Sequence, residues 1–211
     1  MRSVTTIFGV LTLLAAAISQ PLLGQTAAST EKMHTHGLFL GVGASQMTLE
    51  SDELAPGDEG RLGVAGRIGY GFGDLIALVI TGDLSRMDLT FDAQDSEFEL
   101  AHIALGARIH PFRGWRLGPF IEGGWLRYAA TTDRTVPPAT ASSRVTLEGT
   151  GASAAAGLHL FLSRAVSFEA SAAWTDGKLT KSTGSAADAD FTAIPMRSRL
   201  FRLGLTWWLG T

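Results

Sequence analysis

The 211-residue chain contains no cysteine, which excludes a disulfide framework, a thiolate metal site and a cysteine nucleophile. It also lacks any run of lysine or arginine, and with a formal net charge of −3 this argues against nucleic acid as a partner. After residue 28 there is no stretch of apolar residues at helical spacing, so no long helix is expected. The glycine pairs at Gly41-Gly43 and Gly69-Gly71 precede no helix and are not phosphate loops, and no cofactor is expected. The length suits one domain.

The first 28 residues are typical of a secretory signal peptide. A positive start at Arg2 precedes an apolar run from Ile7 to Ala17, and Thr26 and Ala28 supply small residues before a cleavage site. The run is too short for a retained membrane helix. We therefore expect residues 1–28 to be removed on export, with cleavage after Ala17 as the alternative, and residues 29–211 to form the mature domain.

Apolar residues recur with period two along the rest of the chain, which predicts β-strands throughout. Eight such segments can be distinguished: Leu38–Ser45, Arg61–Phe72, Ile76–Ser85, Ala101–His110, Leu117–Trp125, Ala152–Leu160, Val166–Trp174 and Phe201–Trp207. Three connections have tight-turn chemistry, at Gly73-Asp74, at 112–114 and at Ser163-Arg164. The other four are long and polar: Ser51–Gly60, Phe91–Glu97, Thr131–Ser143 and Asp176–Pro195. Short turns at one end and long loops at the other predict a meander whose two ends face different environments.

One face of every segment is apolar and nearly free of charge. The opposite face carries glycine, serine and threonine with a few ionisable residues: Arg67, Asp83, His102, Arg108, Glu122, His159, Glu169 and Arg202. This is the inverted pattern of a barrel in lipid, apolar outward and polar inward. It predicts an all-β, eight-stranded antiparallel up-and-down transmembrane β-barrel. A soluble periplasmic lipocalin-like ligand-binding barrel is the alternative.

Aromatic residues gather near both ends of the predicted strands. Tyr70, Phe72, Phe112, Trp115, Trp207 and Trp208 lie at the short-turn end, whereas Trp125 and Trp174 lie near the long loops. Strands of about ten tilted residues span a membrane, so the two groups predict aromatic girdles at its two interfaces.

The sequence resembles the small eight-stranded outer-membrane barrels of Gram-negative bacteria, which include the OmpA transmembrane domain and the OmpX-like and opacity-type proteins. The resemblance is carried by Arg116–Gly124 (RLGPFIEGG) and by the closing strand Arg199–Leu209 (RLFRLGLTWWL). It implies residence in the outer membrane among lipids and lipopolysaccharide, insertion by the barrel-insertion machinery, and a structural or surface-interaction role. Family members usually end in an aromatic residue, but here Leu209, Gly210 and Thr211 follow Trp208. We expect a monomer.

The inward charges are expected to pair across a narrow lumen, because an unpaired buried charge is costly. Arg67 and Arg202 are predicted to pair with Glu122 and Glu169, with Asp83 and Arg108 in the same network. Such a network either closes the lumen or acts as a gate or proton path, and closure is the simpler interpretation.

No arrangement of residues predicts catalysis. His34 and His36 could hold a metal but lie in a tail, and no metal site is expected. A lipid A-modifying barrel enzyme would need a serine, a histidine and an acid together, whereas Ser153 and His159 are several residues apart. The first two long loops are acidic, with Glu50, Asp52, Glu53, Asp58, Glu59, Asp92, Asp95 and Glu97, but without a calcium-loop spacing. We interpret these as solvated loop residues, with a divalent-cation bridge to lipopolysaccharide as the alternative.

Overall fold

The computed structural model describes residues 35–50, 55–56, 61–91, 94–112, 115–135, 142–183 and 193–209. The predicted signal peptide, residues 1–28, lies outside the described residues. Among the residues described, no helix is long and apolar enough to span a membrane.

The described chain folds into a closed antiparallel β-barrel of eight strands plus one two-residue strand. The strands are β1 (Gly37–Glu50), β2 (Ala55–Pro56), β3 (Arg61–Gly71), β4 (Ile76–Phe91), β5 (Gln94–Ile109), β6 (Leu117–Thr135), β7 (Ser142–Phe161), β8 (Val166–Thr183) and β9 (Ile194–Trp208). Around the barrel the order is β4-β3-β1-β9-β8-β7-β6-β5, and β5 pairs back with β4. Strand β2 only extends the edge of β4. The predicted fold class is confirmed.

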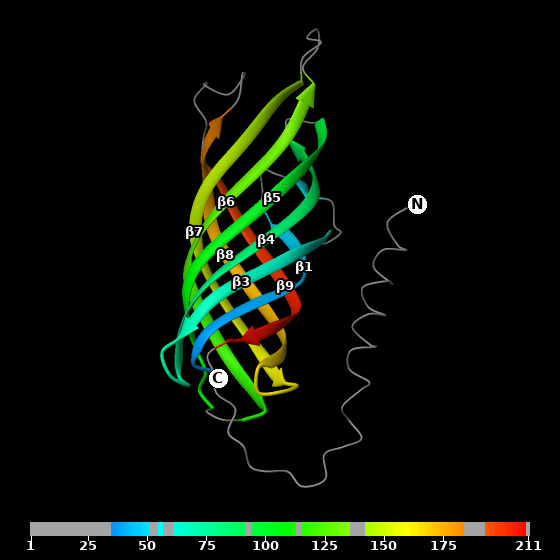
Figure 1. Cartoon of the computed structure of the whole chain (residues 1–211). Coiled ribbons are helices and arrows are strands. Elements are labelled where there is room, and N and C mark those ends of the chain that lie inside the picture. The colour runs from blue at the N-terminus through cyan, green and yellow to red at the C-terminus, as the bar shows by residue number, and fades with distance from the viewer. Residues whose placement is uncertain are drawn as a thin grey trace, which may run out of the picture. The chain divides into compact units, whose positions relative to one another are not determined.

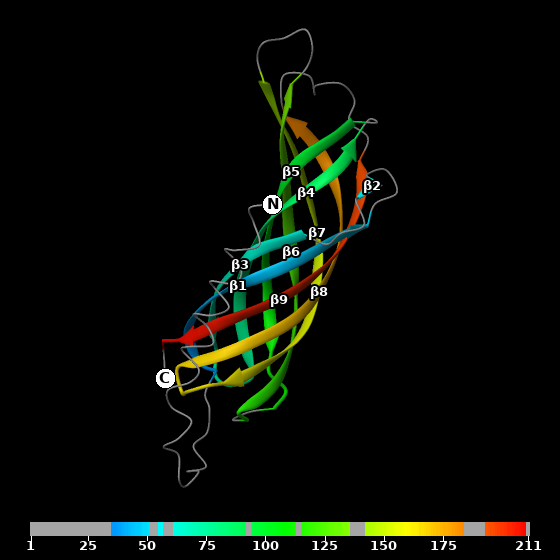
Figure 2. The ribbon, with the colours of Figure 1, turned by 90° about the vertical axis from the view of Figure 1, so that its right-hand side faces the viewer.

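The short turns and the C-terminal end of β9 lie at one end of the barrel, which we call the short-turn end (Figures 1 and 2). At the turn between β3 and β4, Gly73 adopts a positive φ of 81°, and the Phe72 amide donates to the Ile76 carbonyl at 2.8 Å. Between β7 and β8, the Leu162 amide donates to the Val166 carbonyl at 2.9 Å. The opposite end, where the longer connections lie, is the long-loop end.

The strands are longer than the sequence analysis predicts. Most of the loop expected at Phe91–Glu97 belongs to β4 and β5. Strands β6 and β8 run several residues, and β7 two residues, into the loops expected at Thr131–Ser143 and Asp176–Pro195. We call this added part of the strands, beyond Trp125 and Trp174, the long-loop extension.

The extension was not recognised in the sequence because the apolar residues move from the outer face of the strands to the inner face there. On β6 Ile121 and Trp125 point outward, but beyond Trp125 the apolar residues Leu126 and Tyr128 point inward and the next outward residue is Arg127. The same change separates outward Phe201 from inward Leu200 on β9. The strands therefore continue to alternate between apolar and polar residues, but beyond this point the apolar residues face inward and the polar residues face outward.

Small inward residues let the strands close tightly around the lumen. Gly43 on β1 lies opposite Gly204 on β9, and a Cβ at Gly43 would overlap the Leu203 carbonyl oxygen. These small residues leave interior space for the few large side chains described next.

Candidate functional site

Aromatic rings fill the lumen at the short-turn end, and we call this group the ring plug. Its members, each at most 2% exposed, are Phe39, His110, Phe120, His159, Phe161 and Trp208. The ring centroids of Phe39 and Trp208 are 4.6 Å apart, and those of His110 and His159 are 5.1 Å apart. The Trp208 indole Nε1 donates to the Ser167 hydroxyl at 3.1 Å, which fixes the largest ring.

Four ionised side chains, the lower ion cluster, adjoin the ring plug. Arg108 donates through Nη2 and Nε to Glu122 Oε2 at 3.0 and 3.1 Å, and through Nη1 to both Glu169 oxygens at 3.2 Å. Arg67 also pairs with Glu169. The Arg108 guanidinium lies 4.0 Å from the centroid of the Phe120 ring, within cation–π range. Arg108 thus links the charges to the rings.

The remaining inward arginine, Arg202, has a partner of its own. Its Nε and Nη2 donate to the two oxygens of Asp83 at 2.9 and 2.6 Å, in bidentate geometry. Asp83 also lies opposite His102 across the β4–β5 ladder.

Of the expected pairings, Arg67 does pair with Glu169. The pairing of Arg202 with Glu122 or Glu169 is wrong, because Arg202 pairs with Asp83, and the partner of Glu122 is Arg108. Tilted and staggered strands of a barrel place residues that are equally far from the turns at different heights, so the position of a residue along its strand does not identify its partner on another strand.

The six inward charges balance one another, with three arginines against three carboxylates. Each arginine is at most 8% exposed in its side chain and has a carboxylate within ion-pairing distance. Buried charges are tolerated when they are paired and hydrogen-bonded, so the arrangement fills the lumen without net charge.

The interior of the long-loop extension is apolar. Its buried side chains, which we call the long-loop core, are Met47, Leu49, Leu100, Leu126, Tyr128, Leu147, Leu179, Ile194, Met196 and Leu200. Burial raises the pKa of the Tyr128 hydroxyl. Polar contacts occur at its margin, where the hydroxyls of Thr175 and Ser198 lie 2.6 Å apart. The extension is thus packed like a water-soluble protein.

The outer face of the barrel below the extension is apolar and exposed. Leu203 is 55% exposed and Ile121 is also 55% exposed, although both are large hydrophobic residues. Such a continuous belt is incompatible with a soluble lipocalin-like barrel, whose outer face carries charge. The apolar belt therefore overturns that alternative.

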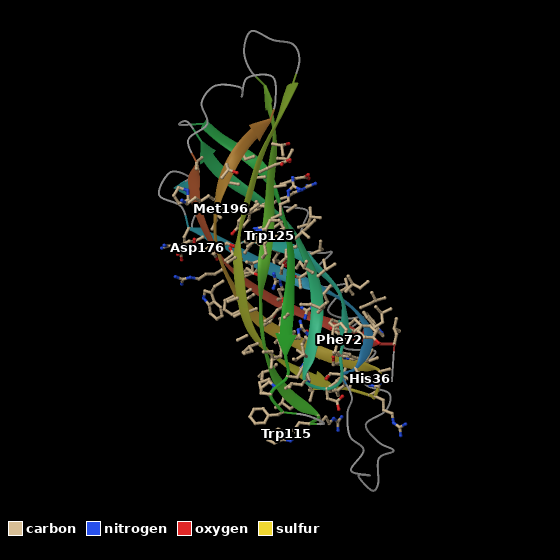
Figure 3. The ribbon with its side chains drawn as sticks, turned by 90° about the vertical axis from the view of Figure 1, so that its left-hand side faces the viewer. His36, Phe72, Trp115, Trp125, Asp176 and Met196 are labelled. Carbon is tan, nitrogen blue, oxygen red and sulfur yellow. The ribbon has the colours of Figure 1, made fainter. Side chains whose placement is uncertain are left out.

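Seven of the eight aromatic residues predicted to form girdles are between 39% and 60% exposed on the outside: Tyr70, Phe72, Phe112, Trp115, Trp125, Trp174 and Trp207. Phe72 and Trp115 lie toward the short-turn end and Trp125 lies farther along the barrel (Figure 3). Trp115 stacks on Phe112 with 4.9 Å between the ring centroids. Trp208 belongs to the ring plug instead.

Charges cover the outside of the long-loop extension. Four cross-strand ion pairs form there, with N···O distances from 2.9 to 3.1 Å: Arg86–Glu99, Arg127–Glu148, Arg197–Asp176 and Arg199–Glu50. They begin immediately beyond the outward aromatic or aliphatic residue of the same strand, such as Arg127 after Trp125. Beyond this level the outer face of the sheet changes from apolar to charged and the inner face becomes apolar, which marks an interface between membrane and water.

The residues considered for catalysis lie apart. The Ser153 hydroxyl donates to the Gly124 carbonyl at 3.4 Å, whereas His159 packs against the rings of Phe120 and Phe161. Within the described part of the chain, no group of three or more potential ligands could hold a metal ion. His34 and the acidic residues Asp52, Glu53, Asp58, Glu59 and Asp92 lie outside the described residues.

The ring plug and the long-loop core were not predicted from the sequence. For the ring plug, the inward parity of Phe39, Phe120 and Phe161 among residues taken as polar was the available signal. For the long-loop core, the signal was the change in which positions are apolar between the predicted strands and the predicted loops, at Leu126-Tyr128 and at Ile194-Met196-Leu200.

Comparison with known proteins identifies the fold. No protein-family model matches the chain, and no curated protein matches it significantly. Among solved structures, it is similar to the outer membrane protein OprG from Pseudomonas aeruginosa, with a TM-score of 0.59 and 11% identity over 83% of this chain and 97% of that one. It is similar to the outer membrane protein AlkL in lipid bilayers, with a TM-score of 0.54 and 16% identity over 89% and 97%. It is also similar to Ail, the attachment invasion locus protein of Yersinia pestis, with a TM-score of 0.54 and 14% identity over 82% and 99%. The fold is therefore that of the small outer-membrane β-barrels, as the resemblance predicted, and the expected outer-membrane location agrees with it.

Proposed function

We propose that the barrel is a closed membrane anchor that holds the long-loop extension outside the cell, where the extension binds other proteins. The observation that carries this proposal is the contrast between the two halves. The membrane part has a lumen filled with rings and paired charges, whereas the extension has an apolar core and a charged outer face. A pore would need a hydrated passage, and a binding protein needs a stable surface in water.

Unpaired strand edges in the extension support a binding role. The β5–β6 ladder ends at Glu99 opposite Thr131, whereas β4 and β5 remain paired to Phe91 and Gln94. Within the described strands, the first residues of β5, 94–98, therefore have no partner on the side of β6. An exposed strand edge can add an extended segment of a partner through main-chain hydrogen bonds. We infer that the partner contributes such a segment.

The similar protein Ail is an attachment protein that has been crystallised with the heparin analogue sucrose octasulfate. The attachment role is in line with our proposal.

Removal of the free edge tests the binding role. We expect a variant with residues 87–98 replaced by a two-residue turn to keep the barrel, because β4 and β5 remain paired below Arg86 and Glu99. Folding is checked by the mobility difference between unheated and heated protein on gels. Cells that display this variant should lose adhesion to protein-coated surfaces, while a variant shortened at the β6–β7 hairpin tip, residues 136–141, should keep it. Equal adhesion of both variants and the parent would refute the edge as the binding surface.

Closure of the lumen is tested separately in vesicles. Lipid vesicles that contain the refolded protein should release small sugars no faster than protein-free vesicles. Solute release that increases with the amount of protein would contradict the anchor function and favour a pore.

Lipopolysaccharide is the lipid partner that we propose. Arg127 and Arg199 occupy the first outward positions beyond the apolar belt on β6 and β9, level with the phosphates of a surrounding lipid layer. Lipopolysaccharide in the bilayer should raise the unfolding temperature, and the increase should shrink in Arg127→Gln. An equal increase in Arg127→Gln and the parent would refute this contact.

A further inference from the structure

Two histidines of the ring plug are buried without hydrogen bonds at several nitrogens. His110 is 1% exposed and His159 is 2% exposed. Both ring nitrogens of His110 and Nδ1 of His159 have no hydrogen-bond partner among the described residues. Buried polar groups are normally paired, so these imidazoles are not accounted for by a structural hydrogen bond.

The rings of these histidines come from different strands and meet inside the barrel. His110 follows β5 and His159 lies on β7, with 5.1 Å between the ring centroids. His159 stacks parallel to Phe120 at 6.4 Å, and His110 meets Trp208 edge to face at 6.2 Å. Protonation of either imidazole would therefore place a charge inside this buried aromatic packing.

The charged groups around the pair are already matched. They are Arg108 on β5, Arg67 on β3, Glu122 on β6, Glu169 on β8 and Asp74 in the β3–β4 turn. The two arginines balance the two glutamates, and Asp74 accepts a hydrogen bond from the Thr35 amide at 3.2 Å. A proton added to either imidazole therefore places an extra positive charge beside Arg108 in a dry site. A second proton places two positive rings side by side.

We propose that the ring plug is an acid-sensitive closure of the short-turn end. Each imidazole takes up one proton from water at a free ring nitrogen, the charged rings separate, and water enters between them. The lower ion cluster still closes the lumen beyond the plug, because its arginine–glutamate pairs do not depend on the histidines.

Proton linkage sets the expected steepness of opening. Uptake of one proton changes the ratio of open to closed plug by about tenfold for each pH unit, and uptake of two protons by about a hundredfold. Replacing one histidine by phenylalanine should therefore reduce the steepness from two protons to one. Replacing both should abolish the acid response, while the aromatic packing is kept.

The experiment uses Trp208 as the reporter. The chain has five tryptophans, and phenylalanine replaces the other four so that the girdles remain aromatic. Quenching of Trp208 fluorescence by acrylamide is measured on the protein refolded into lipid bilayers, from neutral pH down to about 4.5. We expect quenching to rise on acidification and to fall again when the pH is restored. His36→Phe is the matched control, because His36 is exposed outside the plug, and it should leave the response unchanged.

Two outcomes would overturn the proposal. The first is a parent protein whose Trp208 quenching does not change with pH. The second is an acid response that survives in His110→Phe/His159→Phe, which would assign it to carboxylates. If the double variant does not fold, NMR titration of the imidazoles in the parent decides between the explanations. Opening must coincide with protonation of His110 and His159, and opening without their protonation would contradict the mechanism.

Discussion

Removal of the Arg108 charge alone should destabilise the barrel more than simultaneous removal of the charges of Arg108 and its partner Glu122. In Arg108→Met, two buried carboxylates, Glu122 and Glu169, are left facing the single guanidinium of Arg67. Breaking a buried pair by removing one member typically costs about 3–5 kcal/mol. Methionine is an unbranched, uncharged side chain, so the change removes the guanidinium, including its contact with the Phe120 ring, and reports mainly on charge.

The double variant Arg108→Met/Glu122→Gln restores neutrality, because Arg67 and Glu169 remain as a pair. We expect it to recover at least about 2 kcal/mol relative to Arg108→Met. The assay is urea unfolding in lipid vesicles, followed by tryptophan fluorescence. The exposed pair on the extension is the control, and Arg86→Met should change the free energy of unfolding by at most about 1 kcal/mol. Equal losses of stability in the single and double variants would refute a charge-balanced lumen.

Three further changes test other parts of the structure. Leu203→Arg places a charge in the apolar belt and should lower the free energy of unfolding in vesicles by about 2–4 kcal/mol, whereas no such loss would contradict lipid contact. Gly43→Ala should reduce the folded fraction on unheated gels, because its Cβ overlaps the Leu203 carbonyl oxygen; an unchanged fraction would show that β1 and β9 can separate without loss. Met196→Asp should open the long-loop extension to added protease while the folded band on gels persists, and protease resistance equal to the parent would argue against a packed long-loop core.

The sequence was sufficient to predict the barrel because every membrane-crossing strand repeats the same alternation. On β9, for example, the alternation predicts that Leu203 points outward and Arg202 inward, and in the structure Leu203 is exposed and Arg202 is buried. The girdle positions at Trp125 and Trp174 follow from the same alternation combined with strand length. These features depend on residues one or two positions apart, which a single sequence displays.

The interior pairings could not be predicted in the same way, because they join residues far apart in the chain. Arg202 and Asp83 are 119 positions apart and meet only because strand stagger brings them to one height. The long-loop core was missed for a different reason. Its strands follow the rule for water-soluble sheets, and the change of rule at Trp125 is visible only when both parities are compared along one strand.

The central claim is that lipid covers the apolar belt and that water covers the long-loop extension. Nitroxide labels on single cysteines test it directly, since the chain has no cysteine of its own. Labels at Leu203 and Arg197 on β9 are compared by their collisions with oxygen, which concentrates in lipid, and with a nickel chelate, which stays in water. We predict a label at position 203 that meets mainly oxygen and a label at position 197 that meets mainly nickel. A label at position 203 that meets nickel as readily as the one at 197 would contradict the account.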